Sequence, residues 1–260
     1  MKIEFDRDIK NKFPLQGDRG YEARGYMNWS GGKDSALCLY KSLLSKKYHI
    51  SYLLTSINAA HDRISMHGVR RNLLKAQASS IGIPLKTIEL PEQPGMDEYE
   101  QAMMNKVNEL KSSGCTYAIF GDIFLEDLRK YREDKLKEAG IECIFPLWKK
   151  DTTSLIKEFL ALGFKSIIVC VNEQWLDKSF CGRIIDENFL SDLPSNVDPC
   201  GENGEFHSYV FEGPIFNHPV SIKKGDIVYR KYEAPKNMDN HSDKQPEQYG
   251  FYFCDLLEAS

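Results

Sequence analysis

The stretch of sequence that decides the fold is residues 28–35, NWSGGKDS. It follows an apolar run of strand type, 25–29, and precedes a segment with helical periodicity, so we interpret it as a strand-to-helix turn. Two adjacent glycines allow the backbone to turn tightly and expose successive N–H groups, and the positive end of the following helix completes a cradle for anions. Ser30 and Ser35 add hydroxyl donors and Lys33 adds a positive charge. The pattern therefore predicts a phosphate-binding loop.

This loop is not a Walker A motif. The pattern GxxxxGK(S/T) would require glycine at Met27 and serine or threonine at Asp34, and neither is present. A carboxylate beside bound phosphates repels them unless a cation or a hydrogen bond intervenes. We therefore expect Asp34 to hold Mg²⁺ or to fix the loop, because Mg²⁺ on a pyrophosphate group takes only one or two carboxylates. The simpler alternative is a turn that needs its glycines only for backbone geometry.

The rest of the chain alternates between strand-like and helix-like segments. Apolar runs of strand type lie at 25–29, 50–57, 85–90, 117–120, 143–146 and 166–171. Segments of helical period lie at 35–46, 68–80, 97–112, 124–138 and 153–162. This alternation predicts parallel pairing with right-handed crossovers. We therefore predict an α/β fold, a parallel twisted sheet with helices on both faces.

The alternation stops near residue 172, and residues 173–204 are rich in Asp, Asn, Glu, Pro and Gly. Two β-like stretches follow, and then a polar run that ends in an aromatic strand at 249–254. The predicted organisation is an N-terminal extension over 1–23, a nucleotide-binding domain over 24–172, a smaller α+β C-terminal substrate domain over 173–232, and a polar loop with a returning strand over 233–260.

Composition restricts the class of protein. The 260 residues include 34 Lys plus Arg and 38 Asp plus Glu, for a formal net charge of −4, and 42% are hydrophobic. This balance excludes disorder for the bulk of the chain, and no apolar run approaches the roughly 18 residues that cross a bilayer. The first residues lack the apolar core of a secretory signal, so we expect a cytoplasmic protein. The seven cysteines are odd in number and form no CxxC pair, which indicates reduced thiols and disfavours a zinc ribbon or an iron–sulfur site.

The phosphate-binding loop resembles the PP-loop of the N-type ATP pyrophosphatases. Members of that superfamily cleave ATP between its α and β phosphates, leave AMP on a substrate and release pyrophosphate. Their adenine-nucleotide α-hydrolase fold is Rossmann-like, in agreement with the alternation above. The resemblance implies that the nucleotide is ATP.

Two later blocks are similar to the diphthine–ammonia ligase family. Residues 200–208, CGENGEFHS, resemble its C-terminal signature, and residues 121–148 resemble its GDI and LW region, although the second arginine sits one place away from the expected position. The resemblance implies an ATP-dependent amide ligase that adenylates a carboxylate and transfers ammonia to it. The implied acceptor is the diphthine of elongation factor 2 in an archaeal or eukaryotic protein, and an unknown small molecule or protein otherwise.

These blocks define the expected site. The residues expected to bind ATP and its phosphates are Ser30, Gly31, Gly32, Lys33, Asp34, Ser35, Asn58 and His67, with Mg²⁺ on Asp34. The residues expected to take part in catalysis are Lys33, Asp34, Glu202, Glu205 and His207. The residues expected to bind the carboxylate acceptor are Asp122, Arg129 and Arg132.

The residues expected to bind the acceptor are chosen by their expected positions in the fold. Asp122 ends an apolar strand, and ligands of open α/β sheets bind beyond the carboxyl ends of strands. Arg129 and Arg132 lie three apart on a predicted helix and share a face, from which they could grip a phosphate or a carboxylate. The alternative for the arginines is a solvated helix face on which Glu126 and Glu133 are their pairing partners.

The remaining site residues each have a simpler alternative. We expect Glu202 and Glu205 to hold Mg²⁺ or to accept protons from ammonia, and the alternative is a solvated acidic turn. His207 is either a base or a polar residue on a strand face. Asn58 and His67 follow the second strand, and the equivalent loop of the superfamily commonly lines the adenine pocket.

Two other functions stay open. A tRNA-modifying PP-loop enzyme is disfavoured by the missing CxxC pair and by the net negative charge, because tRNA binding needs phosphate neutralisation. Cys181 and Cys200 are candidate persulfide carriers, with buried thiols as the alternative. A non-catalytic adenine-nucleotide-binding protein would not need both the loop and the acidic block. The expected partners are ATP, ammonia and the acceptor, without a membrane or nucleic acid, and the sequence leaves a homo-oligomer open.

Overall fold

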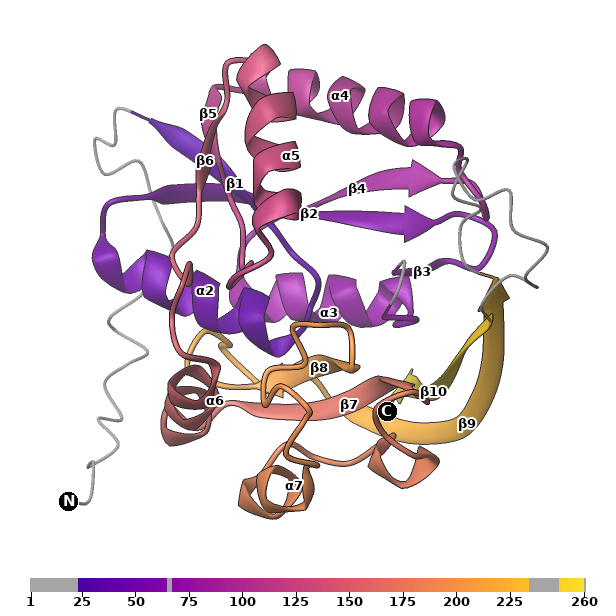
Figure 1. Cartoon of the computed structure of the whole chain (residues 1–260). Coiled ribbons are helices and arrows are strands. Elements are labelled where there is room, and N and C mark those ends of the chain that lie inside the picture. The colour runs from indigo at the N-terminus through magenta and orange to yellow at the C-terminus, as the bar shows by residue number, and fades with distance from the viewer. Residues whose placement is uncertain (1–22, 65–66, 234–247, 260) are drawn as a thin grey trace.

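The first half of the chain forms a six-stranded sheet within the described residues (Figure 1). The structure is a computed structural model, and it describes residues 23–64, 67–233 and 248–259. The strands are β1 (Arg24–Asn28), β2 (His49–Asn58), β3 (Arg63–Ile64), β4 (Leu85–Leu90), β5 (Cys115–Ile119) and β6 (Glu142–Ile144). Their order is β3-β2-β1-β5-β6, with β4 also paired to β2, and every pair is parallel except β2 with β3. The mostly parallel sheet confirms the predicted α/β fold. Strands β2 and β5 lie on opposite sides of β1, so the strand order changes direction at β1, the kind of position at which such sheets bind ligands.

Helices cover both faces of this sheet, as predicted. The helices α2 (Lys33–Ser45) and α3 (Arg71–Ile81) lie on one face, and α4 (Met96–Ser112) and α5 (Glu126–Glu138) lie on the other. Successive strand residues point to opposite faces. Met27 of β1 therefore packs in the core beneath α2 and α3, whereas Tyr26 packs in the core beneath α4 and α5.

The second half of the chain forms a four-stranded antiparallel sheet in the described residues. Its strands are β7 (Lys165–Asn172), β8 (Phe206–Glu212), β9 (Ile222–Glu233) and β10 (Gln248–Glu258), in the order β8-β7-β10-β9. The helices of this half are α6 (Thr152–Ala161), the 3₁₀ turn η1 (Lys178–Phe180) and α7 (Glu187–Asp192). This sheet packs beneath α2 and α3 (Figure 1), and buried apolar residues of its strands, such as Ile168, Phe206 and Leu256, belong to the same core.

The strand expected at 166–171 forms, but the expectation that it continues the parallel series is wrong. As β7, it pairs antiparallel with β8 and β10, so the domain boundary predicted at residue 172 cuts through the second sheet. A continuous apolar run such as SIIVCV fits a buried strand of either kind, and it carries no information on strand direction. Residues 1–22 of the predicted extension and 234–247 of the predicted polar loop lie outside the described residues.

Two sequence expectations can be compared with the whole described chain. All seven cysteines lie among the described residues and carry free thiols, as predicted. None of the helices within the described ranges combines the length and the apolar composition that a bilayer crossing needs.

Candidate functional site

The loop between β1 and α2 turns where only glycine fits. Gly31 has a φ of +76°, and a Cβ atom at this position would lie 2.7 Å from Oε1 of Gln77. A Cβ atom at Gly32 would lie 3.0 Å from the backbone oxygen of Ser208. Both glycines of the NWSGGKDS stretch therefore serve the turn itself, which packs against β8.

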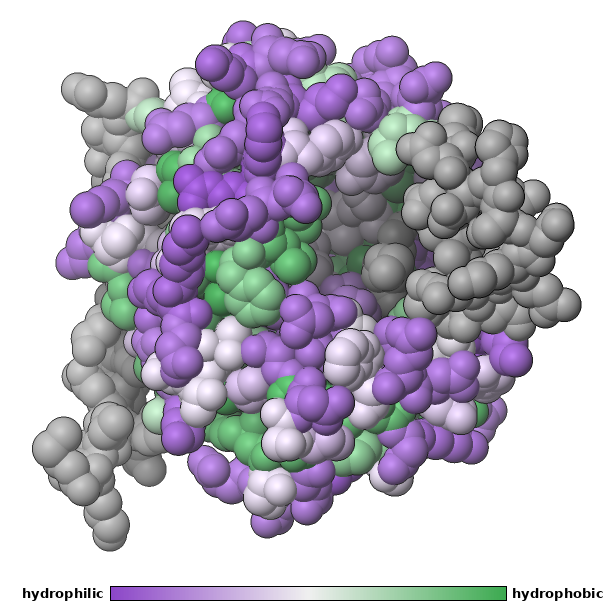
Figure 2. All heavy atoms as spheres, viewed as in Figure 1, coloured by the Kyte–Doolittle hydropathy of each residue, from purple (hydrophilic) through white to green (hydrophobic). Residues whose placement is uncertain are grey.

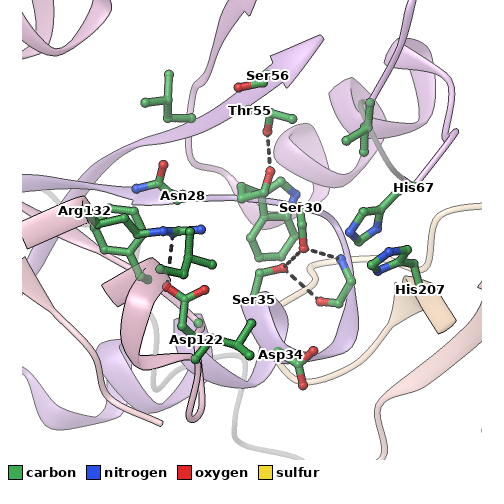
Figure 3. Close-up of a pocket in the computed structure, with 18 of the residues that line it drawn as sticks. Asn28, Ser30, Asp34, Ser35, Thr55, Ser56, His67, Asp122, Arg132 and His207 are labelled. Atoms are coloured by element: carbon green, nitrogen blue, oxygen red, sulfur yellow. Dashed lines mark hydrogen bonds and ion pairs between the residues drawn. The ribbon is translucent and has the colours of Figure 1, made fainter. Parts of the chain in front are cut away.

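Hydrogen bonds hold the loop in shape (Figure 3). The backbone oxygen of Gly31 accepts a hydrogen bond from the backbone N–H of Val210 at 2.9 Å. The hydroxyls of Ser30 and Ser35 lie 3.2 Å apart, and the hydroxyl of Ser35 also donates to the backbone oxygen of Gly32 at 2.9 Å. The N-cap residue of α2, Gly32, has no side chain to cap the helix, although the backbone N–H of Lys33 donates to the hydroxyl of Ser208 at 3.2 Å. The positive end of this helix faces the loop, where it favours an anion.

Lys33 is a buried cation at the start of α2. Its side chain is 5% exposed, and its Nζ lies 2.7 Å from Oδ2 of Asp34 and 5.4 Å from the centre of the Phe206 ring. Burial on its own lowers the pKa of Lys33, but nearby negative charge, chiefly that of Asp34, outweighs it, and the net direction is upward. Lys33 therefore stays positively charged beside the loop.

A cavity of about 780 Å³ opens beside the loop, where β1 and β5 end. Figure 2 shows a hollow in this region, with hydrophobic side chains along one wall. The volume is typical of small-molecule sites. Two buried nitrogens in its wall have no hydrogen-bond partner within the described part of the chain, namely Nδ2 of Asn28 and Nδ1 of His67. Oδ2 of Asp122, in the same wall, has only the ion pair with Arg132 described below. Because buried polar groups are nearly always paired, these atoms indicate that the cavity takes a polar ligand.

Two histidines from distant parts of the chain stack beside the loop. The rings of His67, which follows β3, and His207 on β8 have centroids 4.5 Å apart and planes 23° apart (Figure 3). Burial, with the charge of Lys33 as a second cause, lowers the pKa of His207 to about 4. Burial, and then His207, hold the pKa of His67 well below 6.5. Both imidazoles are therefore neutral near pH 7, and each has one N–H donor and one acceptor nitrogen.

Glu202 and Glu205 have different places in the 200–208 segment. Oε1 of Glu202 accepts a hydrogen bond from the backbone N–H of Ile123 at 2.8 Å, and the residue lines the cavity. Burial, with the negative charge of Asp34 as the next cause, raises the pKa of Glu202 to about 7. Such a carboxyl can exchange a proton near neutral pH.

Glu205 does not reach the cavity, contrary to the expectation of a catalytic carboxylate. It is fully buried, and its oxygens accept hydrogen bonds from the backbone N–H groups of Asp198 at 3.0 Å and Asn203 at 2.9 Å. The side-chain amide of Asn203 donates a third bond at 3.0 Å. The carboxylate of Glu205 therefore holds the turn that presents Glu202, because its acceptor sites are used within that turn.

The two arginines of α5 also lie in different surroundings. Nη1 of Arg132 lies 3.2 Å from Oδ2 of Asp122, and both residues line the cavity (Figure 3). Burial raises the pKa of Asp122, although Arg132 opposes the rise. Arg129 instead lies over the rings of Phe145 and Trp148, and outside the residues that line the cavity. Nε of Arg129 lies 2.7 Å from Oε1 of Glu133. This ion pair is the alternative that the sequence offered for Arg129, a helix face with a glutamate partner.

Asn58 and Cys181 lie outside the cavity as well. Oδ1 of Asn58 accepts from the backbone N–H of His61 at 3.1 Å, so the side chain shapes its own turn. Sγ of Cys181 donates to the backbone oxygen of Tyr252 at 3.3 Å. Cys200 does line the cavity. Burial raises the pKa of both thiols, and thiols react more weakly than thiolates.

Several lining residues escaped the sequence reasoning. Asn28 and Ser56 belong to the same edge of the sheet as Asp122, and the rule that strand ends hold ligands would have found Asn28. Nζ of Lys135 on α5 lies 2.7 Å from Oε2 of Glu100 on α4, and both line the cavity. No sequence signal marks this pair, because it depends on how two distant helices lie together.

The site fits a known family. Residues 23–143 match the diphthamide synthase N-terminal domain, and residues 151–240 match the diphthamide synthase C-terminal domain. The chain belongs to the diphthamide synthase family. The N-terminal match contains the loop, His67 and Asp122, and the C-terminal match contains the 200–208 segment. Strand β10 lies beyond both matches.

Individual relatives in this family are distant. The chain is 21% identical over 228 residues to the diphthine–ammonia ligase of Homo sapiens, which covers 79% of this chain and 85% of the human protein. It is 23% identical over 225 residues to the diphthine–ammonia ligase of Danio rerio, which covers 79% of this chain and 88% of that protein. Among solved structures, the U34-tRNA thiolase of Methanococcus maripaludis is 17% identical over 60% of this chain and 62% of that chain. The TM-score of that comparison is 0.35.

Proposed function

We propose that the chain is an ATP-dependent carbon–nitrogen ligase that adenylates a carboxylate and then transfers ammonia to it, as a diphthine–ammonia ligase does. The observation that supports this most is the pairing of a helix N-terminus and a buried Lys33 with a cavity whose wall holds two buried nitrogens, of Asn28 and His67, without a hydrogen-bond partner in the described residues. The first two features suit a pyrophosphate group. The cavity beside them has room for the nucleoside and the acceptor.

In the first half-reaction, an oxygen of the acceptor carboxylate attacks the α-phosphorus of ATP. The bond between the α-phosphorus and the oxygen that bridges to the β-phosphate breaks, and pyrophosphate leaves with that electron pair. Lys33 and the hydroxyls of Ser30 and Ser35 would hold the pyrophosphate, which develops negative charge. Catalysis of this kind rests on positioning and on preorganised donors rather than on covalent chemistry.

Mg²⁺ fits as an ion carried by the phosphates. Among the described residues, no group of three or more His, Cys, Asp or Glu is arranged to hold a metal, so this part of the chain offers no preformed cage. The Asp34 side chain lies beside the loop and is 29% exposed, which suits the one or two carboxylates of Mg²⁺–nucleotide sites. When bound there, Mg²⁺ would neutralise charge on the leaving pyrophosphate.

In the second half-reaction, ammonia attacks the carbonyl carbon of the acyl-adenylate. The carbon–nitrogen bond forms, the bond from carbon to the AMP oxygen breaks, and AMP leaves. The nitrogen must lose a proton, and Glu202 is the group that we propose accepts it, because its pKa of about 7 suits transfer near neutral pH. Arg132 would hold the acceptor carboxylate once that group replaces Asp122 as its partner. The neutral His67 and His207 would donate N–H groups to phosphate oxygens.

The identity of the carboxylate acceptor is the most specific part of the proposal. The named relatives are diphthine–ammonia ligases, and we propose the diphthine of elongation factor 2, or another carboxylate on a protein or small molecule, as the acceptor here. The chain is incubated with ATP, Mg²⁺, ammonium and each candidate acceptor, and AMP, pyrophosphate and amide are quantified. AMP, pyrophosphate and amide in equal amounts support the proposal. ADP and phosphate as the sole products contradict it, and salt-sensitive retention of bulk tRNA favours the tRNA-modifying alternative.

A further inference from the structure

The C-terminal strand β10 reaches the segment that carries His67. Oδ1 of Asp255 on β10 accepts from Nη1 of Arg63 at 2.8 Å and from Nε of Arg70 at 3.0 Å. Its Oδ2 accepts from Nη2 of Arg70 at 2.6 Å. The carboxylate therefore binds one guanidinium in a two-bond fork and a second guanidinium through a single bond, a geometry that fixes both donors.

The two arginines flank, in sequence, the residues that include His67. Arg63 and Arg70 face each other in an antiparallel bridge, and the backbone N–H of Ile64 donates to the oxygen of Val69 at 2.8 Å. Asp255 thus binds an arginine on each side of His67 in the sequence, and the hydrogen bonds from Arg70, and then the one from Arg63, keep the pKa of Asp255 below its usual range.

Packing on the same strand adds to this contact. A Cβ atom at Gly68 would lie 2.9 Å from the ring of Phe253, so the backbone at Gly68 rests directly on β10. Phe251, two residues before Phe253 and on the same face of the strand, lines the cavity. Figure 1 shows β10 beneath α3 and near β3, in agreement with these contacts.

Asp255 occupies an irregular position in its sheet. Cys254 pairs with Ile227 and Leu256 pairs with Lys224, so two residues of β9, Gly225 and Asp226, lie opposite Asp255 alone. The extra residue of this bulge lies in β9, and a bulge bends the pair of strands locally and is common near functional sites. Here the irregularity coincides with the one residue of β10 whose carboxylate binds both arginines.

We propose that Asp255 is a positioning residue, which acts through Arg63 and Arg70 to hold His67 against the phosphate-binding loop. The proposal rests on the proposed function, and it assigns part of the nucleotide site to a strand that lies beyond both family matches. His67 is the residue to be held because its Cε1 lies 3.2 Å from where a Gly32 Cβ would stand, and because its Nδ1 has no partner in the described residues.

A double-mutant cycle tests the proposal. Asp255→Asn, His67→Ala and the double variant are compared for kcat/KM of ATP in pyrophosphate formation, each corrected for active fraction. We expect each single variant to lose roughly 10–100-fold, the cost of a misplaced group, and the double variant to lie within about twofold of His67→Ala, because the two residues act as one unit. Glu212→Gln, which removes an ion pair at 2.8 Å from the same sheet, is the matched control and should stay near wild type.

A second measurement does not depend on activity. Diethyl pyrocarbonate modifies accessible imidazoles, and mass spectrometry locates the modified residue. We expect His67 to react several-fold faster in Asp255→Asn than in wild type or Glu212→Gln. If the losses of kcat/KM in the two single variants multiply in the double variant, the proposal is overturned. A modification rate at His67 that is unchanged in Asp255→Asn would overturn it as well. A wild-type protein that makes no AMP and pyrophosphate refutes the proposed function instead, and the modification rates then decide the role of Asp255.

Discussion

Replacing Glu202 by glutamine isolates the charge of one carboxyl at the site. Oε1 of Glu202 accepts from the backbone N–H of Ile123 at 2.8 Å, and the glutamine oxygen can keep that bond while the charge is removed. Burial, with Asp34 as the second cause, raises the pKa of Glu202 from 4.5 to about 7. At about 1.4 kcal/mol for each pKa unit, holding this carboxylate ionised in the folded chain costs about 3 kcal/mol.

The direction of the pH dependence follows from proton linkage. The folded chain binds this proton more tightly than the unfolded chain, so the corresponding stability is present below pH 4.5 and is lost as the pH rises through about 7. We expect the free energy of unfolding of Glu202→Gln to lie within about 1 kcal/mol of wild type at pH 5 and to exceed it by about 2–3 kcal/mol at pH 8.

Urea unfolding followed by tryptophan fluorescence at the two pH values measures this difference. Glu212→Gln, from a surface ion pair with Lys165, is the control and should show no such gain at pH 8. In the same preparation, amide formation by Glu202→Gln should fall roughly 10²–10⁴-fold, the usual cost of losing a general base. Equal stabilities at both pH values, or a variant that is less stable at pH 8, would refute the reasoning.

Three further variants test other parts of the site. Ser35→Ala should lower pyrophosphate formation roughly 10²–10³-fold with an unchanged circular dichroism spectrum, and full activity would remove Ser35 from the site. Arg132→Lys should raise KM for the acceptor at least roughly tenfold, whereas Arg129→Lys, outside the cavity, should stay within about twofold; equal effects in steady-state kinetics would contradict the assignment. Glu205→Gln should lower the free energy of unfolding by about 1–3 kcal/mol, because its amide group would face backbone donors, and an unchanged urea midpoint would argue against this role.

The first half of the fold could be predicted because its signals are local. The loop 28–35, the apolar run before it and the helical period after it are adjacent in sequence, and they fix β1, the turn and α2 together. The same alternation extends through α5. The prediction fails at β7, where the partner strands come from residues 206–212 and 248–258 and the apolar run is compatible with either direction.

The site shows the same limit at the level of single residues. Spacing puts Arg129 and Arg132 on a shared side of α5. Only Arg132 lines the cavity, because the guanidinium of Arg129 lies over the rings of Phe145 and Trp148 instead. Glu202 and Glu205 are three residues apart in one acidic turn, but which of them points inward depends on the donors around it. Such differences are set by tertiary neighbours that a single sequence does not reveal.

The shared buried surroundings of the site leave its titratable side chains in different protonation states. Burial acts on all of them, but Asp34 keeps Lys33 positive, whereas Lys33 helps to keep His207 neutral. Glu202 is buried beside Asp34, and its pKa therefore lies near neutrality. At pH 7 the site would thus hold a fixed cation for phosphate, neutral N–H donors and one carboxyl ready to exchange a proton, a separation of pKa values that assigns acid–base roles within a single pocket. The net charge of −4 is irrelevant to this arrangement, because the groups that would contact the nucleotide respond to neighbours a few ångströms away rather than to the charge of the whole chain.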